Sequence, residues 1–299
     1  MDRRARLDGF GVHSQFKTVR TDPLPLHRPR SSLGCGNIDP LGITGSIWAP
    51  GGTSSAGSKL FVATGNTFGA STWSGGEAVV RLAPDLHRST DKRDFFAPPD
   101  WRALDARDAD LGGTNPIPLR IETRNGEQDL ILALGKDGCA YVLDHHNLGG
   151  IGGSLVAQAV LSSAPIRTAP ASYAIGGEAY VAFQGPGAHC PAPVRHDELT
   201  VLKIGMGSPP RMTTAWCADF RGAGSPIVTT TDGHSDPIVW IAGAEGDNRL
   251  HGFGDTGEPI FTGGGSNEVM TGLRHFQTLI ATKNRLFVAA DGRLYAFAF

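Results

Sequence analysis

The sequence has few cysteines and no long apolar run, and both shortages exclude classes of protein. Four cysteines in 299 residues are too few for a disulfide-rich scaffold, and none forms the CxxC pair typical of a zinc site. No apolar run approaches the ~20 residues that cross a membrane as a helix, so we expect no membrane span. The start, MDRRARLDGF, is basic without a following apolar stretch, so we also expect no signal peptide in this chain.

The chain also has no large excess of positive or negative charge. The chain has 27 Lys and Arg against 29 Asp and Glu, and its formal net charge is −2. Without a basic stripe, nucleic-acid binding has no electrostatic basis. A helical period of 3.6 residues nowhere persists for three turns. With 40% hydrophobic residues available for a core, the sequence predicts an all-β protein.

The hydrophobic residues are arranged in repeated strand–turn–strand units. The clearest unit is residues 130–144, LILALGKDGCAYVLD, in which an Asp-Gly turn separates two apolar runs, a strong hairpin signal. Looser copies occupy residues 61–82, 179–202, 238–253 and 286–297. Each copy has an apolar residue at the same place, and consecutive ones are 44 to 61 residues apart. They are Leu82, Leu143, Leu202, Phe253 and Phe297. Repetition on this scale predicts a β-propeller with about five blades.

The chain divides into a short lead-in and one large domain. Residues 1–34 are polar without clear periodicity, and we interpret them as an irregular lead-in to a propeller domain at residues 35–299. The charged residues 91–115 are expected to form a loop on a propeller face. Residues 154–161 fit either a short helix or a strand. The last apolar strand, LYAFAF, has no obvious outermost strand after it.

Two of the cysteines fall in one repeat unit. Cys190 lies in a loop and Cys217 follows a strand-like segment, so a disulfide and two free thiols both fit the sequence. We predict that their Cα atoms lie no more than ~7 Å apart, within disulfide reach. Cys139 is expected to be a small core residue.

Two segments, YVLDHHNLGG and HGFGDTGEP, resemble the repeats of pyrroloquinoline quinone (PQQ) propellers. Four residues then resemble, in order and spacing, a motif set of the quinoprotein alcohol dehydrogenases. They are Trp48 in GITGSIW, Asn66 in ATGN 18 residues later, Asp110 in DADLGG after a further 44, and Lys136 in GKDG after a further 26. The resemblance covers about residues 35–299.

The resemblance implies a role for each of the four residues, with PQQ and calcium as cofactors. Trp48 would bind the cofactor by stacking on the quinone ring. Asn66 would give calcium one oxygen ligand, with Asp110 beside it. Asp110 would also be the catalytic base for the alcohol proton, and Lys136 would contact the quinone oxygens and stabilise the developing oxyanion.

Each of the four residues also has a purely structural interpretation. Trp48 fits a blade-packing aromatic, and Asn66 fits a turn cap because Thr-Gly-Asn is turn chemistry. Asp110 lies in an acidic loop with Asp105 and Asp108, and such loops are usually solvated. Lys136 fits an exposed hairpin tip.

The departures from the family decide which function the sequence favours. The family has eight blades and an adjacent Cys-Cys pair over the quinone, whereas this chain has no such pair and resembles the C-terminal part of a longer propeller. We therefore expect a binding or scaffold module with a vestigial quinone pocket, whose partner is a small molecule or a protein at the propeller face. The alternative is a PQQ- and calcium-dependent alcohol dehydrogenase. The resemblance implies a periplasmic or extracellular location in either case.

Overall fold

The computed structural model of the chain describes residues 45–48, 50–153, 155–160, 162–191, 197–205, 207 and 209–298. Strands dominate this part of the chain, and the only regular helices within it are one short α-helix and three single-turn 3-10 helices. The predicted all-β class is confirmed. The predicted lead-in, residues 1–34, lies outside the described residues.

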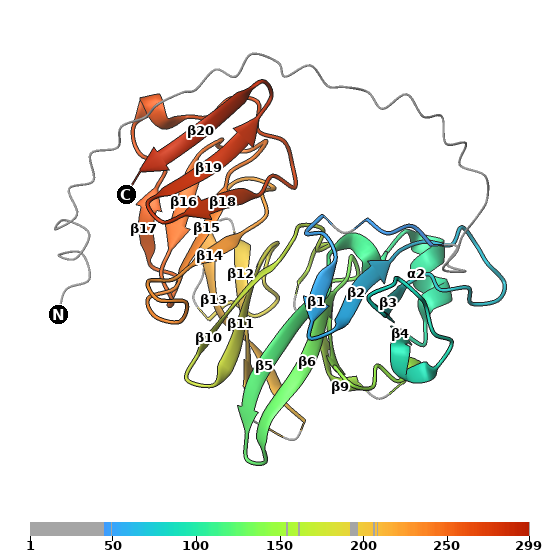
Figure 1. The fold of residues 1–299 in the computed structure, drawn as a ribbon. Helices are drawn as coiled ribbons and strands as arrows, with labels where there is room; N and C mark the ends of the chain where they lie inside the picture. Colours follow the sequence, from blue (N-terminus) through green and yellow to red (C-terminus); the bar gives the residue numbers. More distant parts are fainter. Residues whose placement is uncertain are drawn as a thin grey trace.

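The strands form five sheets that follow one another in chain order, except that β8 belongs to the first sheet although it comes after β7. The first sheet lies at the right of Figure 1 and the fifth at the upper left. The first two sheets comprise β1 (Ser54–Ala56), β2 (Lys59–Thr64), β3 (Ala78–Leu82), β4 (Phe95–Ala97) and β8 (Gly150–Ile151), and then β5 (Ile117–Thr123), β6 (Gly126–Leu134), β7 (Cys139–Asp144) and β9 (Leu155–Val160). The third and fourth comprise β10 (Ala171–Ile175), β11 (Glu178–Gln184), β12 (Asp197–Gly205) and β13 (Arg211–Asp219), and then β14 (Ile227–Thr229), β15 (Ile238–Ala242), β16 (Leu250–Phe253) and β17 (Pro259–Thr262). The fifth comprises β18 (Leu279–Thr282), β19 (Arg285–Ala290) and β20 (Arg293–Ala298).

The sheets are antiparallel meanders, except that β8 adds to β4 of the first sheet as a parallel strand. Their faces are apolar because the next sheet packs against them. One continuous apolar cluster joins each consecutive pair of sheets, through Phe61 and Ile131, Leu132 and Val181, Val201 and Ile241, and Trp240 and Val288. Within the described residues, no such cluster joins the first sheet to the fifth. Blade-on-blade packing of this kind is that of a β-propeller, as the repeats predict.

The five equivalent apolar residues all lie in the third strand of their sheets, as predicted. They are Leu82, Leu143, Leu202, Phe253 and Phe297, and all are buried. Each pairs with an apolar residue of the second strand, for example Leu143 with Ile131 and Phe297 with Leu286. The repeat in the sequence therefore corresponds to the second and third strands of each blade.

Two local expectations are resolved by the sheets. Residues 155–160, which fit either a helix or a strand, form β9 and pair with β7. The fifth sheet has three strands in the described part of the chain, whereas each of the other four has at least four. Among the described residues, β20 is therefore the edge strand of its sheet.

The interpretation of residues 91–115 as a loop is wrong in part. They contain β4, the helix α2 (Trp101–Arg107), and the 3-10 helices η1 (Lys92–Asp94) and η2 (Leu111–Gly113). Helix α2 buries Trp101, Leu104 and Asp105 on one face, but its seven residues are too few for a visible helical period. In the described residues, no helix has the length and apolar character that a membrane crossing needs.

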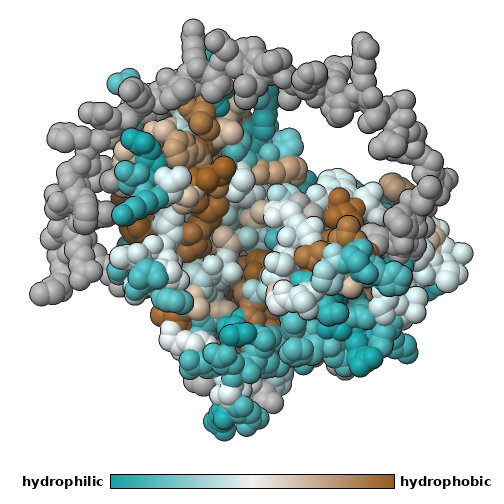
Figure 2. All heavy atoms as spheres, viewed as in Figure 1, coloured by the Kyte–Doolittle hydropathy of each residue, from teal (hydrophilic) through white to brown (hydrophobic). Residues whose placement is uncertain are grey.

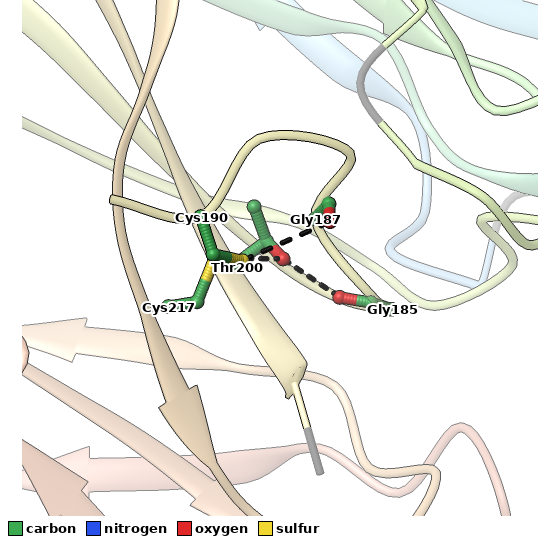
Figure 3. Close-up of a disulfide and its surroundings, with 5 residues drawn as sticks. All are labelled: Gly185, Gly187, Cys190, Thr200 and Cys217. Atoms are coloured by element: carbon green, nitrogen blue, oxygen red, sulfur yellow. Dashed lines mark hydrogen bonds between the residues drawn. A yellow bond between two sulfur atoms is a disulfide. The ribbon is translucent and has the colours of Figure 1, made fainter. Parts of the chain in front are cut away.

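Cys190 and Cys217 form a disulfide, so the first of the two alternatives holds. Their Cα atoms are 5.7 Å apart, as predicted. Figure 3 shows that the bridge ties the loop after β11 to β13, beside Thr200 on β12, whose hydroxyl donates to the Gly185 carbonyl at 2.8 Å. The bridge therefore fixes a loop to the outer strand of the third blade. Cys139 is a buried core residue on β7, as expected.

Removing this disulfide is expected to destabilise the protein measurably. The bridge spans 27 residues, and a loop of that size corresponds to roughly 3 kcal/mol of stabilisation in the chain-entropy account. The Cys190→Ser/Cys217→Ser variant should lose about this much unfolding free energy in urea denaturation, and reductant should lower the wild type to the same value. The control variant Cys139→Ala keeps the disulfide, so reductant should destabilise it as it destabilises the wild type. A double variant as stable as the oxidised wild type would contradict the prediction.

Candidate functional site

Lys136 begins the tight turn between β6 and β7. Gly138 in this turn has φ +76°, a left-handed conformation that favours glycine, and its N–H donates to the Gly135 carbonyl at 3.1 Å. The backbone N–H of Lys136 donates to the carbonyl of Asp110 at 3.0 Å. The hairpin thus holds Lys136 against the segment that carries Asp110.

Asp110 directly precedes η2, and its side chain is fully buried. Its Oδ1 accepts the backbone N–H of Asn66 at 2.9 Å. Its Oδ2 forms an ion pair with the ammonium group of Lys136, whose side chain is only 9% exposed. Both oxygens of the carboxylate are therefore engaged by groups of the chain itself.

Trp48 completes the group of four residues that the sequence singles out. The Nζ of Lys136 lies 4.7 Å from the centroid of the Trp48 ring, within the range of a cation–π contact. The tryptophan is 54% exposed, so it does not pack in a blade core. Trp48, Asn66, Asp110 and Lys136 thus lie together, and the chemical roles that the resemblance implies for them stay predictions.

The side-chain amide of Asn66 shapes the local loop. Its Oδ1 accepts the backbone N–H of Phe68 at 2.5 Å, and its Nδ2 donates to the carbonyl of Asp105 at 3.0 Å. An Asn that bonds the backbone two residues later forms an Asx turn. The turn-capping interpretation of Asn66 therefore describes what its amide does here.

Asp105 corrects the expectation of a solvated acidic loop. It lies on α2 and is buried, accepting the Thr67 hydroxyl at 2.8 Å, the Gly69 N–H at 2.6 Å and the Thr67 N–H. Burial alone raises the pKa of Asp105, but these donors outweigh burial and hold its pKa below the usual value. Asp105 thus fastens the loop after Asn66 to α2.

Glu77 is the site residue that the sequence analysis missed. It is fully buried at φ +50°, and its Oε2 accepts the backbone N–H of Leu111 at 2.8 Å. Its Oε1 has no donor among the described residues and lies beside the Asp110 carboxylate. Burial, opposed by the Leu111 hydrogen bond and assisted by the charge of Asp110, raises the pKa of Glu77 to about 8. The raised pKa therefore favours the neutral acid form of Glu77 at pH 7.

Glycines allow the segments of the site to approach each other closely. A Cβ at Gly112 would lie 2.6 Å from the carbonyl carbon of Thr64, and a Cβ at Gly65 would lie 3.0 Å from the Asp110 side chain. Side chains at these positions would separate the ATGN and DADLGG segments. Glycine at these two positions therefore allows the two segments to pack against each other at the site.

The donor set of the site does not fit calcium. Calcium takes about six to eight oxygen ligands. The oxygens of Asn66, Asp105 and Asp110 already accept hydrogen bonds or an ion pair from this chain. In the part of the chain that the structure describes, no group of three or more His, Cys, Asp or Glu side chains is placed to hold a metal. The Lys136 ammonium lies over the Trp48 ring, on which the resemblance implies a stacked quinone.

No protein-family model matches the chain, and no curated protein matches it. Solved structures do match. Quinohemoprotein alcohol dehydrogenase ADHIIG from Pseudomonas putida HK5 is 14% identical over 82% of this chain and 44% of its own, with a TM-score of 0.50. The quinohemoprotein alcohol dehydrogenase of Comamonas testosteroni is 16% identical over 86% of this chain and 49% of its own, with a TM-score of 0.49. BamB from Moraxella catarrhalis is 15% identical over 83% of this chain and 69% of its own, with a TM-score of 0.39.

The similarity to these structures concerns the fold. This chain spans less than half the length of either quinohemoprotein alcohol dehydrogenase. The chain has the β-propeller fold of the quinoprotein alcohol dehydrogenases, as the PQQ-like repeats predict. Identity of 14% extends the likeness no further than the arrangement of the blades.

Proposed function

We propose that this chain is a PQQ-like-repeat propeller that acts as a binding or scaffold module, and that the surface around Trp48 is a vestigial quinone pocket. The burial of Asp110 supports this proposal most directly. A catalytic base must reach the proton that it removes. Asp110 is fully buried, and both of its oxygens are already engaged by Asn66 and Lys136.

Exposed apolar side chains beside the pocket support a binding role. Ile47 and Trp48 are 44% and 54% exposed, and Phe68, two residues after Asn66, is 84% exposed. Figure 2 shows hydrophobic residues on the surface beside β1 and β2, next to a largely hydrophilic region. Grouped exposed apolar side chains commonly mark interaction sites. The proposed partner is a small molecule or a protein that presents an apolar group to this face.

The disulfide supports an exported location. Disulfides persist in oxidising compartments and are rare in the cytosol. The Cys190–Cys217 bridge therefore favours a periplasmic or extracellular setting, which is also what the resemblance implies.

The alternative is an alcohol dehydrogenase, and the grouping of Glu77, Asp110 and Lys136 favours it. Three side chains that carry or share protons lie in contact, which is common at catalytic sites. Bound PQQ would supply the hydride acceptor. In this alternative, Asp110 would hold the alcohol proton after Lys136 has moved away from it.

Dye reduction distinguishes the two functions. The protein is incubated with PQQ and calcium, and simple alcohols and an electron-accepting dye are then added. We expect no alcohol-dependent dye reduction. Activity that Asp110→Asn abolishes while PQQ binding persists would instead establish the dehydrogenase, because an amide keeps the shape but cannot accept the proton.

A neutral apolar fluorophore tests the binding face. Nile red fluorescence should rise on addition of the wild-type protein and should fall by more than half for Trp48→Ala, because the exposed ring is lost. Leu86→Ala removes an apolar side chain of similar exposure, 55%, outside the group of contacts around Trp48, and should leave the signal unchanged. Equal signals for the two variants would argue against a binding face at Trp48.

A further inference from the structure

We infer that this pocket works without a metal ion, because the ammonium group of Lys136 takes the place of the cation beside Asp110. The inference deepens the proposed function, and it rests on that function in treating the pocket as the binding site. The resemblance implies calcium on Asn66 and Asp110. The contacts of these residues point to a different arrangement.

The first step is the charge balance at Asp110. Its Oδ2 pairs with the Lys136 ammonium, and the two side chains are 0% and 9% exposed. The same ammonium lies 3.3 Å from the Asp108 carbonyl oxygen and 3.4 Å from its Oδ1. One buried negative charge is therefore matched by one buried positive charge. A divalent cation on Asp110 would be repelled by the ammonium at short range, where the shielding by water is weak.

The second step is the state of the other oxygens near the pocket. The Asn66 Oδ1 accepts the Phe68 N–H at 2.5 Å, and the Asp105 Oδ2 accepts the Gly69 N–H at 2.6 Å. Glu77 uses its Oε2 for the Leu111 N–H, and only its Oε1 has no donor among the described residues. To bind a metal, these oxygens would first have to give up bonds that hold the loop and η2 in place. Calcium, which takes about six to eight oxygen ligands, would therefore compete with these hydrogen bonds for the same protein oxygens.

The third step is the position of the ammonium over Trp48. At 4.7 Å from the ring centroid, Lys136 covers one face of the indole. A ligand therefore meets the remaining exposed surface of Trp48 and the exposed Phe68 ring. Because Asp110 already pairs with Lys136, this ammonium offers little net positive charge to a polyanion. The geometry favours a neutral, planar apolar group over an anionic cofactor bridged by metal.

Calcium titration tests the inference. Protein treated with EDTA and dialysed is melted with and without millimolar calcium chloride, in parallel for the wild type and for Asp110→Asn. We expect calcium to change the melting temperatures of the two proteins by the same amount. This amount is zero if calcium does not bind, and it is equal in both if calcium binds elsewhere on the protein. A calcium-dependent rise in the wild type that is absent from Asp110→Asn would overturn the inference.

Lys136→Met gives a second arm, because it removes the ammonium and keeps most of the aliphatic stem over Trp48. A calcium-dependent rise in melting temperature that is found in Lys136→Met but not in the wild type supports the inference. If this variant does not fold, the comparison between the wild type and Asp110→Asn still decides. Dye reduction with PQQ in the absence of calcium would refute the proposed function and leave this inference standing. Calcium binding at Asp110 without dye reduction would refute this inference and leave the proposed function standing.

Discussion

Lys136→Met is expected to lower the free energy of unfolding by about 3–5 kcal/mol, because it leaves a buried carboxylate without its partner. The Asp110 side chain is 0% exposed and the Lys136 side chain 9%, so water cannot replace the lost ammonium. Urea denaturation monitored by tryptophan fluorescence at pH 7 measures the loss. The double variant Lys136→Met/Asp110→Asn should recover part of it, because the unpaired charge is then also removed.

Lys203 provides a matched control for this prediction. It also pairs with a carboxylate, Glu178 at 2.5 Å, and it also lies over an aromatic ring, with its Nζ 5.9 Å from the Tyr180 centroid. Its side chain is 37% exposed, however, and exposed ion pairs contribute about 0–1 kcal/mol. Lys203→Met should therefore cost far less than Lys136→Met. Equal losses would mean that burial of the Lys136 pair has no energetic consequence.

Glu77→Gln is expected to remove a large pH dependence of stability. Burial raises the pKa of Glu77 from its ordinary 4.5 to about 8 in the folded protein, so folding favours the protonated acid. The stabilisation from this proton is complete below about pH 4.5 and is lost as the pH rises towards 8 and beyond. Glutamine cannot ionise, and its amide can donate to Asp110 while its oxygen accepts the Leu111 N–H. The variant should match the wild type near pH 5 and exceed it clearly at pH 9.

Melting temperatures measured from pH 5 to pH 9 check this prediction. The exposed hairpin residue Glu122 offers the same chemical change away from the site, so Glu122→Gln controls for the change in net charge. The difference between Glu77→Gln and the wild type should grow with pH, above any difference that Glu122→Gln shows. A constant difference across this range would mean that Glu77 is ionised in the folded protein throughout.

The all-β class, the five blades and the tight turn at Lys136 follow from the sequence, because they depend on neighbours along the chain. Alternating apolar residues and an Asp-Gly turn specify a hairpin locally, and five copies specify repeated blades. The disulfide was one of two open alternatives, since two cysteines in one unit can be close without being bonded. The spacing of Trp48, Asn66, Asp110 and Lys136 identified residues that the fold brings together, though not what each one does.

Only the tertiary structure decided how these residues are used, because their chemistry depends on partners distant in sequence. Asp110 meets Lys136 and Asn66 from separations of 26 and 44 residues, and Glu77 bonds Leu111 across 34. Burial turns Asp110 from a solvated loop residue into half of an ion pair, and it turns Glu77, one carboxylate among many in the sequence, into a neutral acid. A sequence pattern carries no record of burial at such a site, since burial is set by which blades and loops pack around it.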